Sequence, residues 1–223
     1  MVTIEQLFRQ AQQAGAAEIY LMAGRKPAAR IGGKIKNLDY PELSSTEAEK
    51  ILLEMLDAKQ AAQYRETKSV DEMIAFHGIG RFRVHIYQND GVPSACVKII
   101  NKKEGLPEEL KALAGITQGL VLVCGKPHSG KSATLAALAE QMLAGRFMHL
   151  VTLESPVEYP IEAGKGLLSR RCIGKDTGSY KEGMDNLLHE SADGVLIGEL
   201  ETPEAVSFLL HMVRVLRFSE VAS

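Results

Sequence analysis

The stretch that decides the fold is GLVLVCGKPHSGKSATLAALAEQM, residues 119–142. It begins with a continuous apolar run, Leu120–Cys124, which is typical of a strand buried on both faces of a parallel sheet. The segment Gly125–Ser132 (GKPHSGKS) then matches the phosphate-binding pattern GxxxxGK[ST]. The Ala/Leu-rich segment Ser132–Leu143 predicts a helix. A strand, a glycine-rich loop and a helix in this order predict a nucleotide-binding α/β domain.

Each residue type in this loop has a chemical reason. Gly125 and Gly130 let the backbone turn so that successive N–H groups face a phosphate, and the helix N-terminus adds its dipole. Lys131 would bring positive charge to the β- and γ-phosphates, and the Ser132 hydroxyl would ligate Mg²⁺. A glycine-rich turn that binds nothing would need neither side chain. We therefore predict a site for ATP and Mg²⁺, formed by Gly125, Lys126, Pro127, His128, Ser129, Gly130, Lys131, Ser132 and Ala133.

A phosphate loop also needs an acidic partner at the end of a neighbouring strand. Glu199 follows the apolar run Gly194–Ile197, and Glu154 follows the run His149–Leu153. Ligands of parallel sheets gather at the carboxyl ends of the strands, where both residues would lie. The alternative for either residue is a solvated loop carboxylate.

The first hundred residues have a different pattern. Residues 3–14 and a segment beginning at Ser44 have helical spacing, whereas the strand-like segments are separated by glycine-containing turns. The strand-like segments are 19–22, 28–31, 34–38, 69–76, 81–87 and 95–100. The predicted organisation is an α+β domain over residues 1–103, a linker over 104–117 and an α/β domain over 118–223.

Composition limits the class of protein. The chain has 223 residues, a net charge of −2 and 45% hydrophobic residues, so it predicts a globular protein with no electrostatic case for nucleic acid. Its apolar runs fall short of the ~20 residues that cross a bilayer. Three cysteines without close spacing fit a reduced, cytoplasmic protein.

Six ordered segments resemble the secretion-type hexameric ATPases, above all the type IV pilus retraction motors. GLVLVCGKPHSGKSATLAALAEQM is similar to the Walker A segment, HLVTLESPVEY to the Asp box, and ADGVLIGELETPEA to the Walker B region. GIGRFRVHIYQND resembles the arginine strand of the N-terminal domain. The remaining two are the opening segment IEQLFRQAQQAGAAEIYLMAGRKPAARIGGKIKNL and the connecting strand SRRCIGKDTGSY.

The resemblance implies a PAS-like α+β domain followed by a RecA-like P-loop core, assembled as a homo-oligomeric ring of six. Such a ring would convert ATP hydrolysis into motion of an inner-membrane pilus or secretion platform, with the ATPase on the cytoplasmic side. By position, Glu199 would be the Walker B glutamate and a metal ligand with Ser132. Glu154 and Glu158 would be the acids of the Asp box. Arg81 and Arg83 would reach a nucleotide, and their alternative is a solvated strand face.

The sequence also departs from the family pattern. Ser155 replaces the aspartate of the Asp box, and Lys98 stands where an arginine is usual. The segment before Walker B, residues 189–193 (HESAD), keeps only Asp193, and residues 200–202 (LET) replace Met-Arg-Asp. The chain stops at Ser223, where the resemblance places the start of the His-box segment, so we expect an incomplete RecA-like core.

Three functions are therefore compared. The first is an active motor ATPase, and the second is a degenerate ATP-binding or assembly paralogue that does not hydrolyse ATP. The third, a small-molecule kinase with a P-loop, leaves the first domain unexplained. A shortened sheet would expose an edge, so we also expect irregular or lower-order oligomers from the isolated chain.

Overall fold

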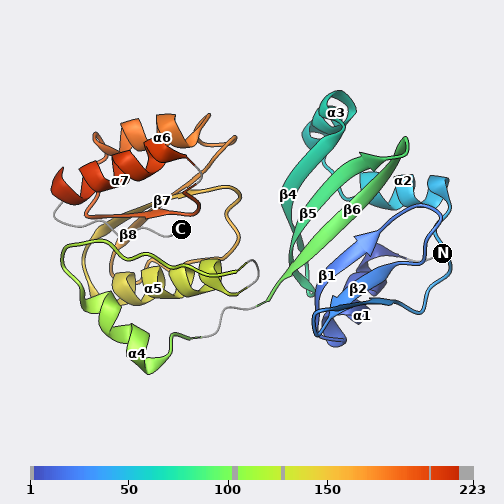
Figure 1. Cartoon of the computed structure of the whole chain (residues 1–223), viewed down its shortest axis with the longest axis horizontal. Coiled ribbons are helices and arrows are strands. Elements are labelled where there is room, and N and C mark those ends of the chain that lie inside the picture. The colour runs from blue at the N-terminus through green and yellow to red at the C-terminus, as the bar shows by residue number, and fades with distance from the viewer. Residues whose placement is uncertain (1–2, 102–104, 127–128, 201, 216–223) are drawn as a thin grey trace. The chain divides into compact units, whose positions relative to one another are not determined.

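The computed structural model describes residues 3–101, 105–126, 129–200 and 202–215. The chain divides into two compact units, residues 1–101 and 102–223 (Figure 1). Each unit contains its own sheet and its own hydrophobic core, so the two are described separately.

Unit 1 is an antiparallel sheet of six strands with three helices. The strand order is β3-β2-β1-β6-β5-β4. Helix α3 was not predicted from the sequence, because Tyr64 is its one buried side chain. The elements are α1 (Ile4–Gln13), β1 (Ala16–Leu21), β2 (Ala28–Ile31), β3 (Lys34–Asn37), α2 (Ser45–Leu53), α3 (Ala58–Thr67), β4 (Ser69–Phe76), β5 (Gly80–Asn89) and β6 (Val92–Ile100).

Two tight turns set the register of this sheet. Ile31 pairs with Lys34 across Gly32-Gly33, where φ is 56° and 79°. Asn89 pairs with Val92 across Asp90-Gly91, where φ is 49° and 79°. Positive φ at both central residues is the geometry of a two-residue hairpin whose twist matches that of the strands. The glycine-containing turns expected from the sequence therefore fix which side chains face the core.

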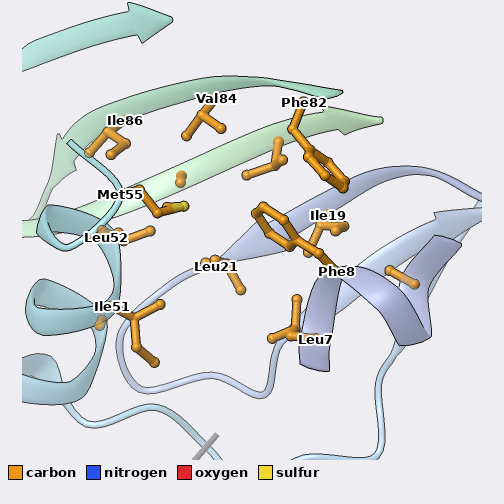
Figure 2. Close-up of a cluster of buried hydrophobic side chains, with 14 of the residues drawn as sticks. Leu7, Phe8, Ile19, Leu21, Ile51, Leu52, Met55, Phe82, Val84 and Ile86 are labelled. Carbon is orange, nitrogen blue, oxygen red and sulfur yellow. The ribbon is translucent and has the colours of Figure 1, made fainter. Parts of the chain in front are cut away.

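The core of unit 1 lies between this sheet and helices α1 and α2 (Figure 2). Phe8 of α1 meets Phe82 of β5 with ring centroids 4.4 Å apart, and Phe76 lies edge-on to both rings. Ile19, Phe82, Val84 and Ile86 are all fully buried. Side chains on the opposite face of the sheet include charged residues, which gives the inside/outside alternation of a sheet covered on one face.

Unit 2 contains a parallel sheet in the order β8-β7-β9. Helix α5 lies on one side of the strands and helices α6 and α7 lie on the other (Figure 1). Its elements are α4 (Glu108–Lys111), a 3₁₀ turn η1 (Ala112–Gly115), α5 (Lys131–Gly145), β7 (His149–Glu154), β8 (Leu167–Cys172), α6 (Tyr180–Leu187), β9 (Gly194–Ile197) and α7 (Pro203–Val215).

The predicted strand Leu120–Cys124 is wrong as an assignment, because the structure has no strand there. Three of its side chains nevertheless pack against the cores of unit 2. Leu120 contacts the cluster on the α6/α7 side, whereas Val121 and Val123 contact the cluster on the α5 side. A strand also requires a hydrogen-bonded neighbour. Among the described residues, β9 forms its ladder with β7 and not with residues 120–124. The apolar run therefore predicted neither the ladder nor full burial correctly, because Leu120, Val121 and Val123 are half-buried while Leu122 and Cys124 are exposed.

The helices of the described segments are short compared with a bilayer. Helix α5 has 15 residues, and about 20 apolar residues are needed to cross the hydrocarbon core. None of the helices in these segments is both long and apolar enough to span a membrane.

Candidate nucleotide site

The glycine-rich loop is tightly folded. A Cβ added to Gly125 would lie 2.6 Å from Ser129 Oγ, so a larger residue would push against the loop. Gly130 has φ of 95°, which is a conformation that favours glycine. The backbone N–H of Ser129 donates to the carbonyl of Lys126 at 3.2 Å. The two predicted binding residues Pro127 and His128 lie outside the described residues.

Helix α5 begins directly after this loop. Its N-cap is Gly130, and no side chain of the described residues caps it. Lys131 Nζ donates to the carbonyl oxygens of Gly125 at 3.0 Å and Lys126 at 3.3 Å, so the ammonium group lies over the loop. Ser132 is exposed and Ala133 is half-buried in the first turn. Uncapped N–H groups and an ammonium group together provide the donors that an anion requires.

The loop lies at the edge of the sheet where the strands end. Helix α5 ends at Gly145 and β7 begins at His149, so the end of the helix lies near the start of the strand. Leu138 and Met142 of α5 pack with Leu150 of β7. The 15 residues of α5 span about 22 Å, and the six residues of β7 span about 20 Å. The start of α5 is therefore level with the end of β7.

Two predicted acids stand at this edge. Glu154 is the last residue of β7, and Glu199 follows β9 after one glycine. The Gly198 N–H donates to the Leu153 carbonyl at 2.8 Å, which continues the ladder beyond Ile197. A Cβ at Gly198 would lie 3.4 Å from Glu154 Cα. Adjacent parallel strands therefore carry Glu154 and Glu199 to neighbouring positions, with Glu199 exposed.

The Glu154 carboxylate is held by two donors. Thr152 Oγ1 donates to Glu154 Oε1 at 2.7 Å, and Arg170 donates through NH2 to the same oxygen at 3.0 Å. Arg170 NH2 also donates to the Tyr159 carbonyl at 2.6 Å. The side chains of Arg170 and Glu154 are only 20% and 14% exposed, so water screens this ion pair less than one at the surface.

Glu158, the second predicted acid of the Asp box, is buried with 6% of its surface exposed. Burial, and then the nearby charge of Glu158, raises the pKa of Tyr159 above its ordinary value. Within the described segments, no three His, Cys, Asp or Glu side chains form a group that could hold a metal ion by themselves. Ser132 and Glu199 therefore remain predicted partners of a metal that is also held by phosphate oxygens.

The predicted arginines belong to the other unit. Arg81 and Arg83 lie on β5, both half-exposed on the charged face of the sheet. Arg83 forms an ion pair with Asp71 of β4, with NH2 2.8 Å from Oδ2 and Nε 3.1 Å from Oδ1. This contact fits the alternative of a charged strand face, and a role toward nucleotide stays a prediction.

Comparisons with known proteins decide the family. Residues 87–214 match the model of the family described as type II/IV secretion system protein. The chain belongs to this family. The family match covers β6, the last strand of unit 1, and all of the phosphate loop, β7, β8 and β9.

The relatives in this family include pilus ATPases. The chain is 30% identical over 216 residues to the type IV pilus retractation ATPase PilT of Pseudomonas aeruginosa, which covers 93% of this chain and 62% of that protein. It is 30% identical over 190 residues to a twitching motility protein of Neisseria gonorrhoeae, covering 82% of this chain and 51% of that protein. The chain thus spans between about half and three fifths of the length of these relatives.

Two solved structures of ATPases and pilus motors have the same fold. A crystal structure of the pilus retraction motor PilT with bound ADP matches all of this chain and 67% of its own, with a TM-score of 0.86 and 30% identity. The Legionella pneumophila ATPase DotB matches 98% of this chain and 64% of its own, with a TM-score of 0.82 and 20% identity. The α/β fold of this chain is therefore the fold of the PilT and DotB structures.

Sequence reasoning missed two residues of the site, Thr152 and Arg170. Both face Glu154 because β7 and β8 pair in parallel with Thr152 opposite Arg170. No local pattern predicts that pairing, since it depends on the register of two strands separated by a long loop. The one available signal was the pair of arginines in SRRC, of which one faces the site and the other, Arg171, binds Glu190.

Proposed function

We propose that this chain is an ATP-binding and ATP-hydrolysing subunit of a pilus-retraction or type II secretion motor. The observation that carries the proposal is the loop Gly125–Ala133 with Lys131 at the start of α5, in a chain that matches an ADP-bound retraction motor over its whole length. In this proposal unit 2 is a RecA-like P-loop core and unit 1 is a PAS-like domain.

The loop residues would hold the nucleotide. Backbone N–H groups of the loop and of the first turn of α5 would bind the β-phosphate, while Lys131 would leave its loop carbonyls for the β- and γ-phosphate oxygens. Mg²⁺ held by Ser132 would offset phosphate charge. Hydrolysis adds a water oxygen to the γ-phosphorus and breaks its bond to the ADP oxygen. Glu199 and Glu154, at neighbouring strand ends, would orient that water and take its proton.

The assembly is proposed on the same basis. Arg81 and Arg83 would supply positive charge to the γ-phosphate of another copy of the chain, which would link hydrolysis to formation of a homo-oligomeric ring. Such a ring would act on proteins of an inner-membrane pilus or secretion platform from its cytoplasmic side. The ion pair between Arg83 and Asp71 would have to open for Arg83 to take this role.

A second candidate function is nucleotide binding without hydrolysis. It is favoured by two observations at the Asp box. Ser155 stands where an aspartate is usual, and the carboxylate of Glu154 is already engaged by Arg170. In this case the chain would join an assembly and bind ATP without turning it over.

Calorimetric titration with Mg·ATP, together with phosphate release, tests both candidates. Replacing Lys131 with Ala removes charge-assisted hydrogen bonds worth about 1.5–3 kcal/mol, so the Kd should rise about 10- to 150-fold. Lys181→Ala is the matched control, because Lys181 is an exposed lysine in the first turn of α6. Binding that Lys131→Ala leaves unchanged would refute the nucleotide site. Tight binding with no phosphate release beyond that of Lys131→Ala would select the second candidate.

A further inference from the structure

We propose that Arg170 is a positioning residue for hydrolysis, acting through Glu154. The inference rests on the proposed function, because it assigns Arg170 a role in the same site. No sequence motif assigns Arg170 to that site, because Arg170 lies within the edge strand β8 and not at the end of a strand.

The first argument is the geometry around Glu154. Because β7 lies between β8 and β9, Arg170 reaches the carboxylate from the side opposite to β9. Thr152 and Arg170 both donate to Oε1. Within the described part of the chain these two donors fix one oxygen of the carboxylate, and the second oxygen, Oε2, keeps its lone pairs for water at the strand end.

The second argument is electrostatic. The backbones at Glu154 and Gly198 are in contact, so Glu154 and Glu199 stand at neighbouring strand ends. The negative charges of two carboxylates and of the phosphates of a nucleoside triphosphate at one sheet edge would repel each other. A guanidinium 3.0 Å from Glu154 places a positive charge beside one of these carboxylates and offsets the repulsion. Glu154 and Glu199 can therefore be present together with phosphates.

The third argument is that Arg170 also holds the chain that follows Glu154. Its NH2 group bridges the carboxylate of Glu154 and the carbonyl of Tyr159, five residues further on. The same guanidinium leaves its buried Nε atom without a hydrogen-bond partner among the described residues. An arginine optimised only for stability would satisfy that donor, since an unpaired buried donor is costly. The placement instead serves the two contacts at the strand end.

The test is a double-mutant cycle between Arg170 and Glu154 in the full chain, measured by phosphate release and by Mg·ATP titration. For Arg170→Met we expect the turnover number to fall at least ~10-fold, because a misplaced catalytic group can cost ~100-fold, while the Kd for nucleotide changes less than ~3-fold. Glu154→Gln should lower turnover as well. The double variant should be no slower than Glu154→Gln alone, because Arg170 acts through that carboxylate. Arg170→Lys, which keeps the charge, should recover part of the turnover.

The matched control is Arg171→Met. Arg171 is the next residue on β8, is 18% exposed and also pairs with a carboxylate, that of Glu190. It should lower the unfolding temperature without changing turnover. If Arg170 were only structural, Arg170→Met would leave turnover unchanged, as Arg171→Met does, or its effect on turnover would add to that of Glu154→Gln. Either result would overturn the inference.

The outcomes separate this inference from the proposed function. Wild-type chain that binds no Mg·ATP would refute the proposed function itself. Wild-type chain that binds Mg·ATP without turnover would overturn the role of Arg170 and leave the nucleotide site standing. Wild-type turnover that Arg170→Met leaves intact would overturn the role of Arg170 alone.

Discussion

The ring cluster of Phe8, Phe76 and Phe82 gives the sharpest test of how unit 1 is held together. Phe82 on β5 is fully buried, and its ring lies 4.4 Å from Phe8 and 5.8 Å from Phe76 between centroids. Replacing it with Ala removes the transfer free energy of a buried ring, opens a cavity and ends two aromatic contacts. We expect the free energy of unfolding of unit 1 to fall by about 3–5 kcal/mol.

The control is the same substitution at an exposed position. Phe147 lies between α5 and β7 and is 88% exposed, so Phe147→Ala should change the free energy of unfolding by no more than about 0.5 kcal/mol. Phe82→Leu keeps an apolar side chain at the buried position and should give an intermediate loss. It also keeps the comparison useful if Phe82→Ala does not fold.

The assay is equilibrium unfolding in urea followed by far-ultraviolet circular dichroism. With a slope of about 1–3 kcal/mol per molar urea, the midpoint of the unit 1 transition should fall by at least ~1 M for Phe82→Ala. Hydrogen exchange in peptides from β5 assigns the lost stability to unit 1. A loss below about 1.5 kcal/mol, or one no larger than that of Phe147→Ala, would refute the assignment of this cluster as the centre of the core.

Three further predictions address the helix cap, the thiols and a tight glycine. Ser44→Ala should destabilise α2 by about 1 kcal/mol at neutral pH. Hydrogen bonds from Ser44 hold the pKa of Glu47 below its ordinary value. The stability that Glu47 contributes is therefore present above its unfolded pKa and is lost as pH falls through its folded pKa. Urea unfolding should accordingly show a smaller difference in unfolding free energy between wild type and Ser44→Ala at pH 3 than at pH 7. Burial raises the pKa of the half-buried Cys96 thiol, so a thiol reagent should modify the exposed Cys124 faster than Cys96. Mg·ADP should slow the modification of Cys124 alone. Equal rates of modification at Cys96 and Cys124 would contradict the structure at Cys124. Gly164→Ala, at φ 55° and with a Cβ 2.7 Å from the backbone of α5, should cost unit 2 about 1–3 kcal/mol in thermal unfolding, and an unchanged melting temperature would show that the loop can move away.

Much of unit 1 could be predicted from its sequence, because its signals are local. Strands β2 and β4 coincide with the predicted segments 28–31 and 69–76, and the turns at Gly32-Gly33 and Asp90-Gly91 are marked by their residue types. Helix α3 could not be predicted in the same way. Its sequence AKQAAQYRET has no apolar stripe, and it depends on the cap at Asp57 and on contact with β4.

The candidate site also has a part that could be predicted from local sequence and a part that could not. The loop Gly125–Ser132 is contiguous, so its residue types reveal it without any structure. The support of Glu154 by Thr152 and Arg170 depends on a parallel pairing between strands whose residues lie far apart in the sequence. The segment Leu120–Cys124 shows the limit of a local pattern. Its apolar run predicted a buried strand, but Leu122 and Cys124 are exposed, and a ladder depends on a neighbour elsewhere in the chain.

The separation of the cores has a consequence for biosynthesis. Every member of the unit 1 core, from Leu7 to Ile99, precedes the phosphate loop in the chain. A ribosome adds ~5–20 residues per second, so the roughly 120 residues of unit 2 take about 6–24 s to synthesise. Domains of the size of unit 1 can fold within that time. Unit 1 can therefore reach its native packing during translation, while the later part of unit 2 is still being made.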